Sequence, residues 1–313
     1  MIPAMLAGAH RAVDAFAIWT EDRVRREPQP CRLAAPDPLD CFGPLPPLPG
    51  PPPPAGTWSV PSPRPAWAGD RLVVHAHPAR GTARGVVLLV PPWKLRGAGP
   101  MRGWIRLVTD AGLDAWMLVP PHHLERVAPG ARSGEAFVSL DLPRVRASLE
   151  QLVLEIRLCA ALAAAVRRSD GTDGWTVGLV GLSLGALAAA LAATAAERVD
   201  QAALIAPPDL TSVVASTGVG RRYRRLAALA GSPWPTEEAL AAALAPLDPA
   251  SRAPTARRLF VAAALHDAIA PPAGALRLAH AWGVAPAVYP RGHITLLFGC
   301  RRLREDLRRF LLA

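Results

Sequence analysis

Lysine is almost absent from this sequence: of its 35 basic residues only Lys94 is a lysine, and the others are arginines. The net charge of +10 therefore reflects a general preference for arginine, alongside alanine and proline, and is weak support for a nucleic-acid partner. No basic run is interleaved with aromatic residues, and the densest cluster, residues 221–225, is expected to be a solvated helix face. We expect no nucleic-acid partner.

Cysteine is also scarce, since the chain has four cysteines in 313 residues. They form no C-x-x-C motif and have no histidine at metal-ligand spacing, so we expect no metal site and no cofactor. Cys159 and Cys300 lie in apolar, helical surroundings and are predicted to be core thiols. Cys31 and Cys41 are able to form a disulfide in an oxidising compartment, but nothing in the sequence requires one.

The sequence has no recognisable signal peptide, because no basic region precedes its first apolar stretch, which His10 and Arg11 interrupt. We therefore assign the protein to the cytoplasm. Residues 174–196 contain no charged side chain, but glycines and Ser183 interrupt their first half. Alanine is the most frequent of the remaining residues and inserts poorly into a bilayer, so we expect no integral membrane segment.

The first 56 residues differ from the rest of the chain. Residues 3–26 are predicted to form an amphipathic helix, whose apolar residues at helical spacing are Met5, Leu6, Ala9, Val13, Phe16 and Trp19. Its polar side carries charges of both signs, so we expect the apolar face to pack on the domain rather than on a membrane. Residues 27–56 are proline-rich and should be an extended connector. This arm, 1–56, should lie outside the catalytic domain, 57–313.

From Thr57 onward, predicted strands alternate with predicted helices. The strands are 57–60 and 71–77, both placed at the edge, then 85–90, 113–119, 175–180, 201–206, 259–265 and 286–289. The helices are 103–111, 142–168, 184–198, 272–282 and 294–312. This order predicts an α/β fold with a doubly wound, mostly parallel sheet, in which ligands bind at the carboxyl ends of the strands. Residues 207–254 interrupt the alternation and are expected to be a helical cap.

The most informative motif is G-x-S-x-G at residues 181–185. A short apolar strand precedes it and an alanine- and leucine-rich helix follows, which is typical of a nucleophile elbow with Ser183 at the turn. Strand and helix pass very close together there, and larger side chains at Gly181 and Gly185 would collide. The helix N-terminus behind Ser183 favours the negative charge that develops during acyl transfer.

From Thr57 to Ala313 the chain resembles the α/β-hydrolases in its strand pattern, its elbow and its order of serine, aspartate and histidine. Hydrolases of this superfamily often carry a H-D-x-x-x-P-like turn after the next-to-last strand. Here residues 266–272 read HDAIAPP. The resemblance therefore implies that Asp267 is the acid of a catalytic triad.

The base of such a triad usually follows the last strand in a Gly-His pair, and here Gly292 and His293 follow strand 286–289. His293 is therefore the expected base. A neutral serine is a poor nucleophile, so the histidine must take its proton, and a buried aspartate holds the imidazole in the right tautomer.

The oxyanion hole needs two backbone N–H groups. One is expected from Leu184, directly after the nucleophile. The other should come from the loop after strand 85–90, where the sequence has Pro91-Pro92-Trp93-Lys94 in place of the common His-Gly pattern. Proline has no N–H, so Trp93 or Lys94 must donate.

Two segments are candidates for the walls of the pocket. The loop with His122 and His123 resembles the corresponding loop of bacterial hydrolases related to the α/β-hydrolase domain-containing protein 18 family. No third metal ligand accompanies these histidines, so we expect a pocket rim there rather than a metal site. Trp234 in the 207–254 segment is the expected substrate contact of the cap.

These features favour a serine hydrolase that cleaves a small-molecule carboxylic ester, as a carboxylesterase or a lipase-like enzyme. Two alternatives remain open. The same triad also serves acyltransferases and peptidases, and a protein of this fold can bind a small molecule without catalysis. The intact triad speaks against the last alternative, whereas the unusual Pro91-Pro92 loop speaks for it.

Overall fold

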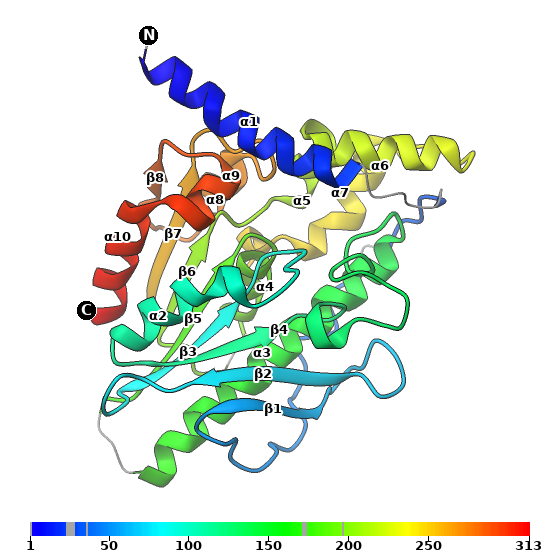
Figure 1. The fold of residues 1–313 in the computed structure, drawn as a ribbon. Helices are drawn as coiled ribbons and strands as arrows, with labels where there is room; N and C mark the ends of the chain where they lie inside the picture. The colour runs from blue at the N-terminus through cyan, green and yellow to red at the C-terminus, as the bar shows by residue number, and fades with distance from the viewer. Residues whose placement is uncertain (1, 23–28, 36, 171–173, 196) are drawn as a thin grey trace.

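One sheet organises the chain, which we describe from a computed structural model. The structure describes residues 2–22, 29–35, 37–170, 174–195 and 197–313. The eight strands lie in the order β1-β2-β4-β3-β5-β6-β7-β8 (Figure 1). They are β1 (Gly56–Pro61), β2 (Arg71–His77), β3 (Gly85–Val90), β4 (Asp114–Val119), β5 (Thr176–Leu182), β6 (Gln201–Ile205), β7 (Arg258–Ala264) and β8 (Ala287–Tyr289).

The predicted α/β class is confirmed, because strands β4, β3 and β5 to β8 run parallel and helices cover the sheet. Strands β1 and β2 are antiparallel, and β2 is also antiparallel to β4. The placement of residues 71–77 at the edge was wrong, since β2 lies between β1 and β4. The α-helices are α1 (Ile2–Asp22), α2 (Arg102–Asp110), α3 (Leu142–Asp170), α4 (Leu184–Ala192), α5 (Leu210–Ser216), α6 (Gly218–Leu229), α7 (Glu237–Leu244), α8 (Pro272–Ala281), α9 (His293–Gly299) and α10 (Arg301–Leu312).

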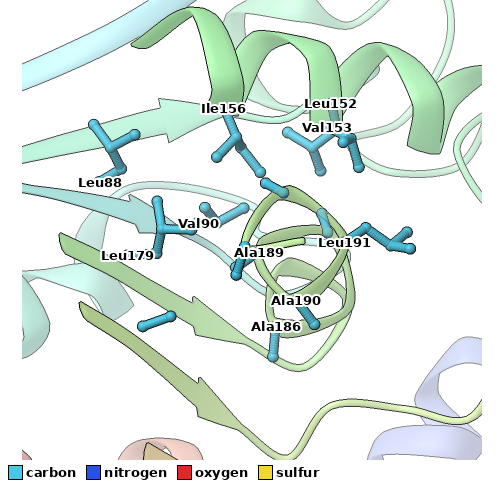
Figure 2. Close-up of a cluster of buried hydrophobic side chains, with 14 of the residues drawn as sticks. Leu88, Val90, Leu152, Val153, Ile156, Leu179, Ala186, Ala189, Ala190 and Leu191 are labelled. Atoms are coloured by element: carbon cyan, nitrogen blue, oxygen red, sulfur yellow. The ribbon is translucent and has the colours of Figure 1, made fainter. Parts of the chain in front are cut away.

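Each face of the sheet carries its own apolar core. In β3, Leu88 and Val90 point to the face covered by α3 and α4, whereas Val87 and Leu89 point to the face covered by α2 and α10. Figure 2 shows part of the first of these cores, with side chains of α3 above α4 and side chains of β3 and β5 beside it. Because both faces are buried, the strand needs a continuous apolar sequence, which is what 85–90 provides.

Two predicted helices have different ends in the structure. The elbow helix stops at Ala192 rather than at residue 198, because the side chain of Thr255 donates to the carbonyl of Ala193 (2.9 Å). The last helix is divided at Cys300, whose backbone is extended (φ −97°, ψ 98°). Within the described ranges, the structure contains no helix with the length and apolar character that a membrane span requires.

Helix α1 lies across the top of the molecule in Figure 1, next to α9 and α6. The last residues of the predicted helix, 23–26, are outside the described residues. Its expected orientation was wrong: Met5, Leu6, Val13, Phe16 and Trp19 are exposed, whereas Asp14 is fully buried.

In its described parts before β1, the connector after α1 has no helix and turns at residues 40–43, and it contributes Leu39 and Cys41 to the apolar core beside α3. Cys31 and Cys41 are free thiols, as are Cys159 and Cys300.

Candidate active site

Ser183 lies at the sharp turn between β5 and α4. Its backbone is strained, with φ 53° and ψ −117°, a combination that side-chain-bearing residues rarely adopt. A Cβ atom at Gly181 would stand 2.4 Å from the carbonyl oxygen of Gly185, and one at Gly185 would stand 2.2 Å from that of Val90. Only glycine fits at either position, so the motif reflects the close passage of α4 over β5 and β3.

The structure brings Ser183, Asp267 and His293 together at the carboxyl ends of three strands. His293 Nε2 lies 2.8 Å from Ser183 Oγ, and His293 Nδ1 lies 2.6 Å from Asp267 Oδ2. All three residues are buried. Asp267 follows β7 and His293 follows β8, so the parallel strands deliver all three side chains to one edge of the sheet.

The second oxygen of Asp267 is held by its own turn. Asp267 Oδ1 accepts hydrogen bonds from the N–H groups of Ile269 (2.8 Å) and Ala270 (2.7 Å), which leaves Oδ2 directed at His293. Burial alone would lower the pKa of His293, but the charge and hydrogen bond of Asp267, with the charge of Asp14, outweigh burial and raise the pKa above its ordinary value. The imidazole is therefore a stronger base than an ordinary histidine.

Leu184 follows Ser183 directly, and Trp93 lines the same cavity as Ser183. Among the described residues, the backbone N–H groups of Leu184 and Trp93 have no acceptor. The expectation for Lys94 needs correction, because its N–H donates to His123 Nε2 (3.0 Å). Lys94 also has a positive φ of 60°, which turns the chain sharply directly after Trp93. Of the two candidates in this loop, only Trp93 keeps its N–H available.

His122 and His123 were expected at the pocket rim, but neither lines the cavity at Ser183. His123 is fully buried and braces the loop that follows β3. Its Nδ1 donates to the carbonyl of Pro121 (2.8 Å), since its Nε2 accepts from Lys94. Burial, as the largest cause, lowers the pKa of His123 to about 4, so the ring is neutral at neutral pH.

Further contacts from the same segment fix the loop after β3. Trp93 Nε1 donates to the carbonyl of Gly134 (2.6 Å), and the Ser133 hydroxyl donates to the carbonyl of Leu95 (2.5 Å). A side chain at Gly134 would stand 2.6 Å from the ring of His123. The segment that contains His122 and His123 is thus a scaffold for the loop of Trp93.

A buried ionic cluster, which the sequence analysis missed, anchors this scaffold. Arg126 contacts both oxygens of Asp70 at 3.0 Å and both oxygens of Glu155 at 2.7 and 2.8 Å. Removing one partner would leave a buried charge uncompensated, at a cost of about 3–5 kcal/mol. No sequence signal identified Arg126, because its partners lie far from it along the chain.

A cavity of about 480 Å³ opens at Ser183 and His293. Helix α1 contributes Ala17, Ile18 and Thr20, and α6 contributes Val219, Arg222 and Tyr223. The other lining residues are Pro92, Trp93, Lys94, Leu95, Arg96, Pro100, Ile269, Ile294, Leu297 and Phe298.

Trp234 was expected to contact the substrate, but it lies outside the cavity lining. It packs against a small apolar cluster formed by Leu140, Tyr223 and Ala227, and its ring lies under the guanidinium of Arg224. The 207–254 segment therefore reaches the cavity through α6. Among the described residues, no three histidine, cysteine or acidic side chains gather as a metal site would require.

Comparison with known proteins agrees with this architecture. A family model described as serine hydrolase matches residues 156–310. No curated protein matches the chain. Among solved structures, a lipase in its open form is similar with a TM-score of 0.53 and 14% identity, over 82% of this chain and 98% of the lipase.

Two esterases are similar over the same share of this chain, 82%. An acetyl xylan esterase from Paenibacillus sp. R4 has a TM-score of 0.51 and 16% identity over 87% of its length. A carboxyl esterase from Bacillus coagulans has a TM-score of 0.51 and 11% identity over 97% of its length. At these identities the similarity is one of fold. Together with the family match, it supports an α/β-hydrolase fold and a serine hydrolase activity for this chain.

Proposed function

We propose that this serine hydrolase cleaves carboxylic esters of small molecules through an acyl-enzyme on Ser183. The observation that carries the proposal is the hydrogen-bonded chain from Ser183 through His293 to Asp267, with distances of 2.8 and 2.6 Å, whose first two members line the 480 Å³ cavity. The volume lies within the range of ordinary small-molecule pockets. The lipase and esterase folds described above support the ester as the bond attacked.

In the first half of the reaction, Ser183 Oγ attacks the ester carbonyl while His293 Nε2 takes the hydroxyl proton. Asp267 keeps the other ring nitrogen protonated and stabilises the imidazolium that forms. The carbonyl oxygen becomes negative and is stabilised by the N–H groups of Leu184 and Trp93. His293 then returns its proton to the leaving alcohol, and the acyl group stays on Ser183.

In the second half, a water molecule replaces the alcohol. His293 takes a proton from this water as it attacks the acyl carbon, and it returns the proton to Ser183 when the bond to the acyl group breaks. The acyl group leaves as a carboxylic acid. The apolar side chains of Ile18, Val219 and Leu297 line the cavity and would surround an aliphatic or aromatic acyl group.

A fluorophosphonate probe together with a series of p-nitrophenyl esters tests this proposal. We expect covalent labelling at Ser183 and release of p-nitrophenol, both abolished by Ser183→Ala. Ser216→Ala is the matched control, because this exposed serine lies on α5, outside the cavity lining. A wild-type protein that neither labels nor hydrolyses any ester of the series would instead be a small-molecule-binding member of the fold.

A further inference from the structure

Asp14 is a fully buried carboxylate on a helix that lies outside the sheet. A charged side chain is rarely buried unless it is paired, because its transfer from water is costly. Here the partners are backbone groups. Asp14 Oδ2 accepts from the N–H of His293 (2.8 Å) and of Ala268 (3.1 Å), and Oδ1 accepts from the N–H of Ile294 (3.0 Å).

These hydrogen bonds join the two loops that carry the acid and the base. Ala268 follows Asp267 directly, and the N–H of His293 belongs to the base itself. Asp14 Oδ2 therefore links the backbone of His293 to that of Ala268, the residue next to Asp267, and so joins the two loops that make the 2.6 Å contact between His293 and Asp267. Asp14 also occupies the place of an N-cap side chain for α9, which the preceding Gly292 cannot supply.

Other contacts fit helix α1 closely to the loop of the base. A Cβ atom at Gly292 would stand 2.7 Å from the carbonyl oxygen of His10 and 2.8 Å from Asp14 Oδ2, so only glycine allows this approach. His10 Nδ1 lies 3.0 Å from the hydroxyl of Thr295 on α9. Ile18 on the same side of α1 reaches Gly218 on α6. Several contacts therefore hold α1 against α9 and α6, where its residues line the cavity.

The charged groups around His293 come from several elements. Asp267 lies on one side of the ring and Asp14 behind its backbone, while Lys94 and Arg222 line the same cavity. Burial lowers the pKa of His293, and the charge of Asp14 acts with that of Asp267 to raise it. Among the described residues, Arg96 also lines this cavity, and His10, His266 and Arg291 lie near the loop of His293.

We propose that Asp14 is a positioning residue, which holds the loops of Asp267 and His293 in register, so that helix α1 completes the reaction centre. This rests on the proposed role of His293 as the base. Asp14 is not among the residues that line the cavity, and its hydrogen bonds go to backbone N–H groups. It acts through the backbone of His293, and its removal should affect the turnover rate more than substrate binding.

The principal test is Asp14→Asn, which keeps the size of the side chain but removes its charge and places N–H donors opposite N–H donors. We expect kcat to fall about 10- to 100-fold, because small displacements of reacting groups cost this much. KM should change less than kcat. The pKa of His293, followed by NMR in the uninhibited protein, should fall. Glu305→Gln, which removes an exposed charge on α10, is the matched control and should change neither quantity.

Thermal melting shows whether Asp14→Asn is folded. A folded variant in which either kcat or the pKa of His293 keeps its wild-type value overturns the proposal.

If the variant does not fold, Gly292→Ala tests the same contact with the carboxylate intact, and Gly299→Ala is its control, because a Cβ atom there meets nothing within 4 Å. We expect Gly292→Ala to lose less kcat than Asp14→Asn, and Gly299→Ala to keep the wild-type kcat. Equal kcat values of the two glycine variants would overturn the proposal. If the wild type proves inactive on every ester, the proposed function fails separately, and the titration of His293 alone decides the role of Asp14.

Discussion

The central sheet and helix α1 both contact the region of His293, but they are held there by different interactions. The carboxyl ends of β5, β7 and β8 deliver reacting side chains from a sheet whose two faces are buried among apolar residues. Helix α1 turns its polar residues His10 and Asp14 inward, and it leaves Phe16 and Met5 exposed. The sheet is held by apolar burial, whereas α1 is held in large part by hydrogen bonds to a few backbone and side-chain groups.

This difference teaches that an apolar stripe does not by itself identify the buried face of a helix. The residues His10, Asp14, Ala17 and Ile18 recur at helical spacing and form the face that meets α9 and α6. Asp14, with three backbone donors, is one of the groups that hold this face inward. The predictions below test how far the two parts depend on each other, from the largest effect to the smallest.

The largest effect on kcat is expected for the three side chains at the strand ends, Ser183, Asp267 and His293. Ser183→Ala and His293→Ala should each reduce kcat by about 10⁴- to 10⁶-fold, and the double variant should lose little more, because the residues act as one unit. Asp267→Ala should cost less, since His293 would remain as a poorly oriented base. The measurement is the rate of p-nitrophenyl ester hydrolysis, with thermal melting to establish that each variant is folded. Near-normal activity of His293→Ala would contradict the proposed triad.

Most of the fold was predictable from the sequence, because its signals are local. The apolar runs of β3 and β5 require burial on both faces, and the strand-to-helix turn at Ser183 requires glycine two residues away on each side. Parallel topology then brings the ends of β7 and β8 to the same edge. These steps need no knowledge of distant contacts.

The remainder of the site depends on contacts between distant segments. In the sequence, Asp14 looks like an ordinary surface charge on an amphipathic helix. Its three backbone donors are more than 250 residues away along the chain, and nothing near Asp14 in the sequence indicates them. The loss of Lys94 as an oxyanion donor depends on His123, whose ring reaches its N–H from another loop. The spacing of His10 and Asp14 on one helical face was a usable signal, but the stronger apolar periodicity of Met5 to Trp19 concealed it.

The pH dependence tests both carboxylates at once. Neutral His293 is the active base, so kcat/KM should fall as the pH drops through its pKa, by about tenfold for each pH unit below it. Asp267 and Asp14 raise this pKa against the effect of burial, so the midpoint should lie above that of an ordinary histidine. A pH profile of kcat/KM on a neutral ester measures it. A midpoint below the ordinary value would mean that burial prevails over the two carboxylates.

Like helix α1, the loop of His123 supports the site without supplying a reacting side chain, because its ring holds the loop of Trp93. His123→Ala removes the acceptor of the Lys94 N–H and leaves the backbone of the loop free to move away from its positive φ. Trp93 would then be poorly placed, and we expect kcat to fall about tenfold or more, with a smaller change in KM. His280→Ala, an exposed histidine on α8, is the control. A folded His123→Ala protein with wild-type kcat would show that Trp93 needs no such support.

The smallest effects are expected for substitutions on α1 that compare its cavity-facing side with its exposed side. Ile18 lines the cavity and packs toward Gly218, whereas Phe16, two residues away, is 62% exposed and stacks only on Trp19 among the aromatic rings described. Ile18→Ser should raise KM for long acyl esters several-fold, because it removes apolar contact at the cavity wall, and it should spare acetate esters. Phe16→Ser should leave kcat and KM unchanged and alter the free energy of unfolding by no more than about 0.5 kcal/mol, as is usual for exposed positions. Steady-state kinetics on acetate and octanoate p-nitrophenyl esters, with urea unfolding of both variants, make the comparison. If Phe16→Ser instead impaired hydrolysis while Ile18→Ser did not, helix α1 would have to present its apolar stripe to the substrate, and the inward position of Asp14 would be refuted with it.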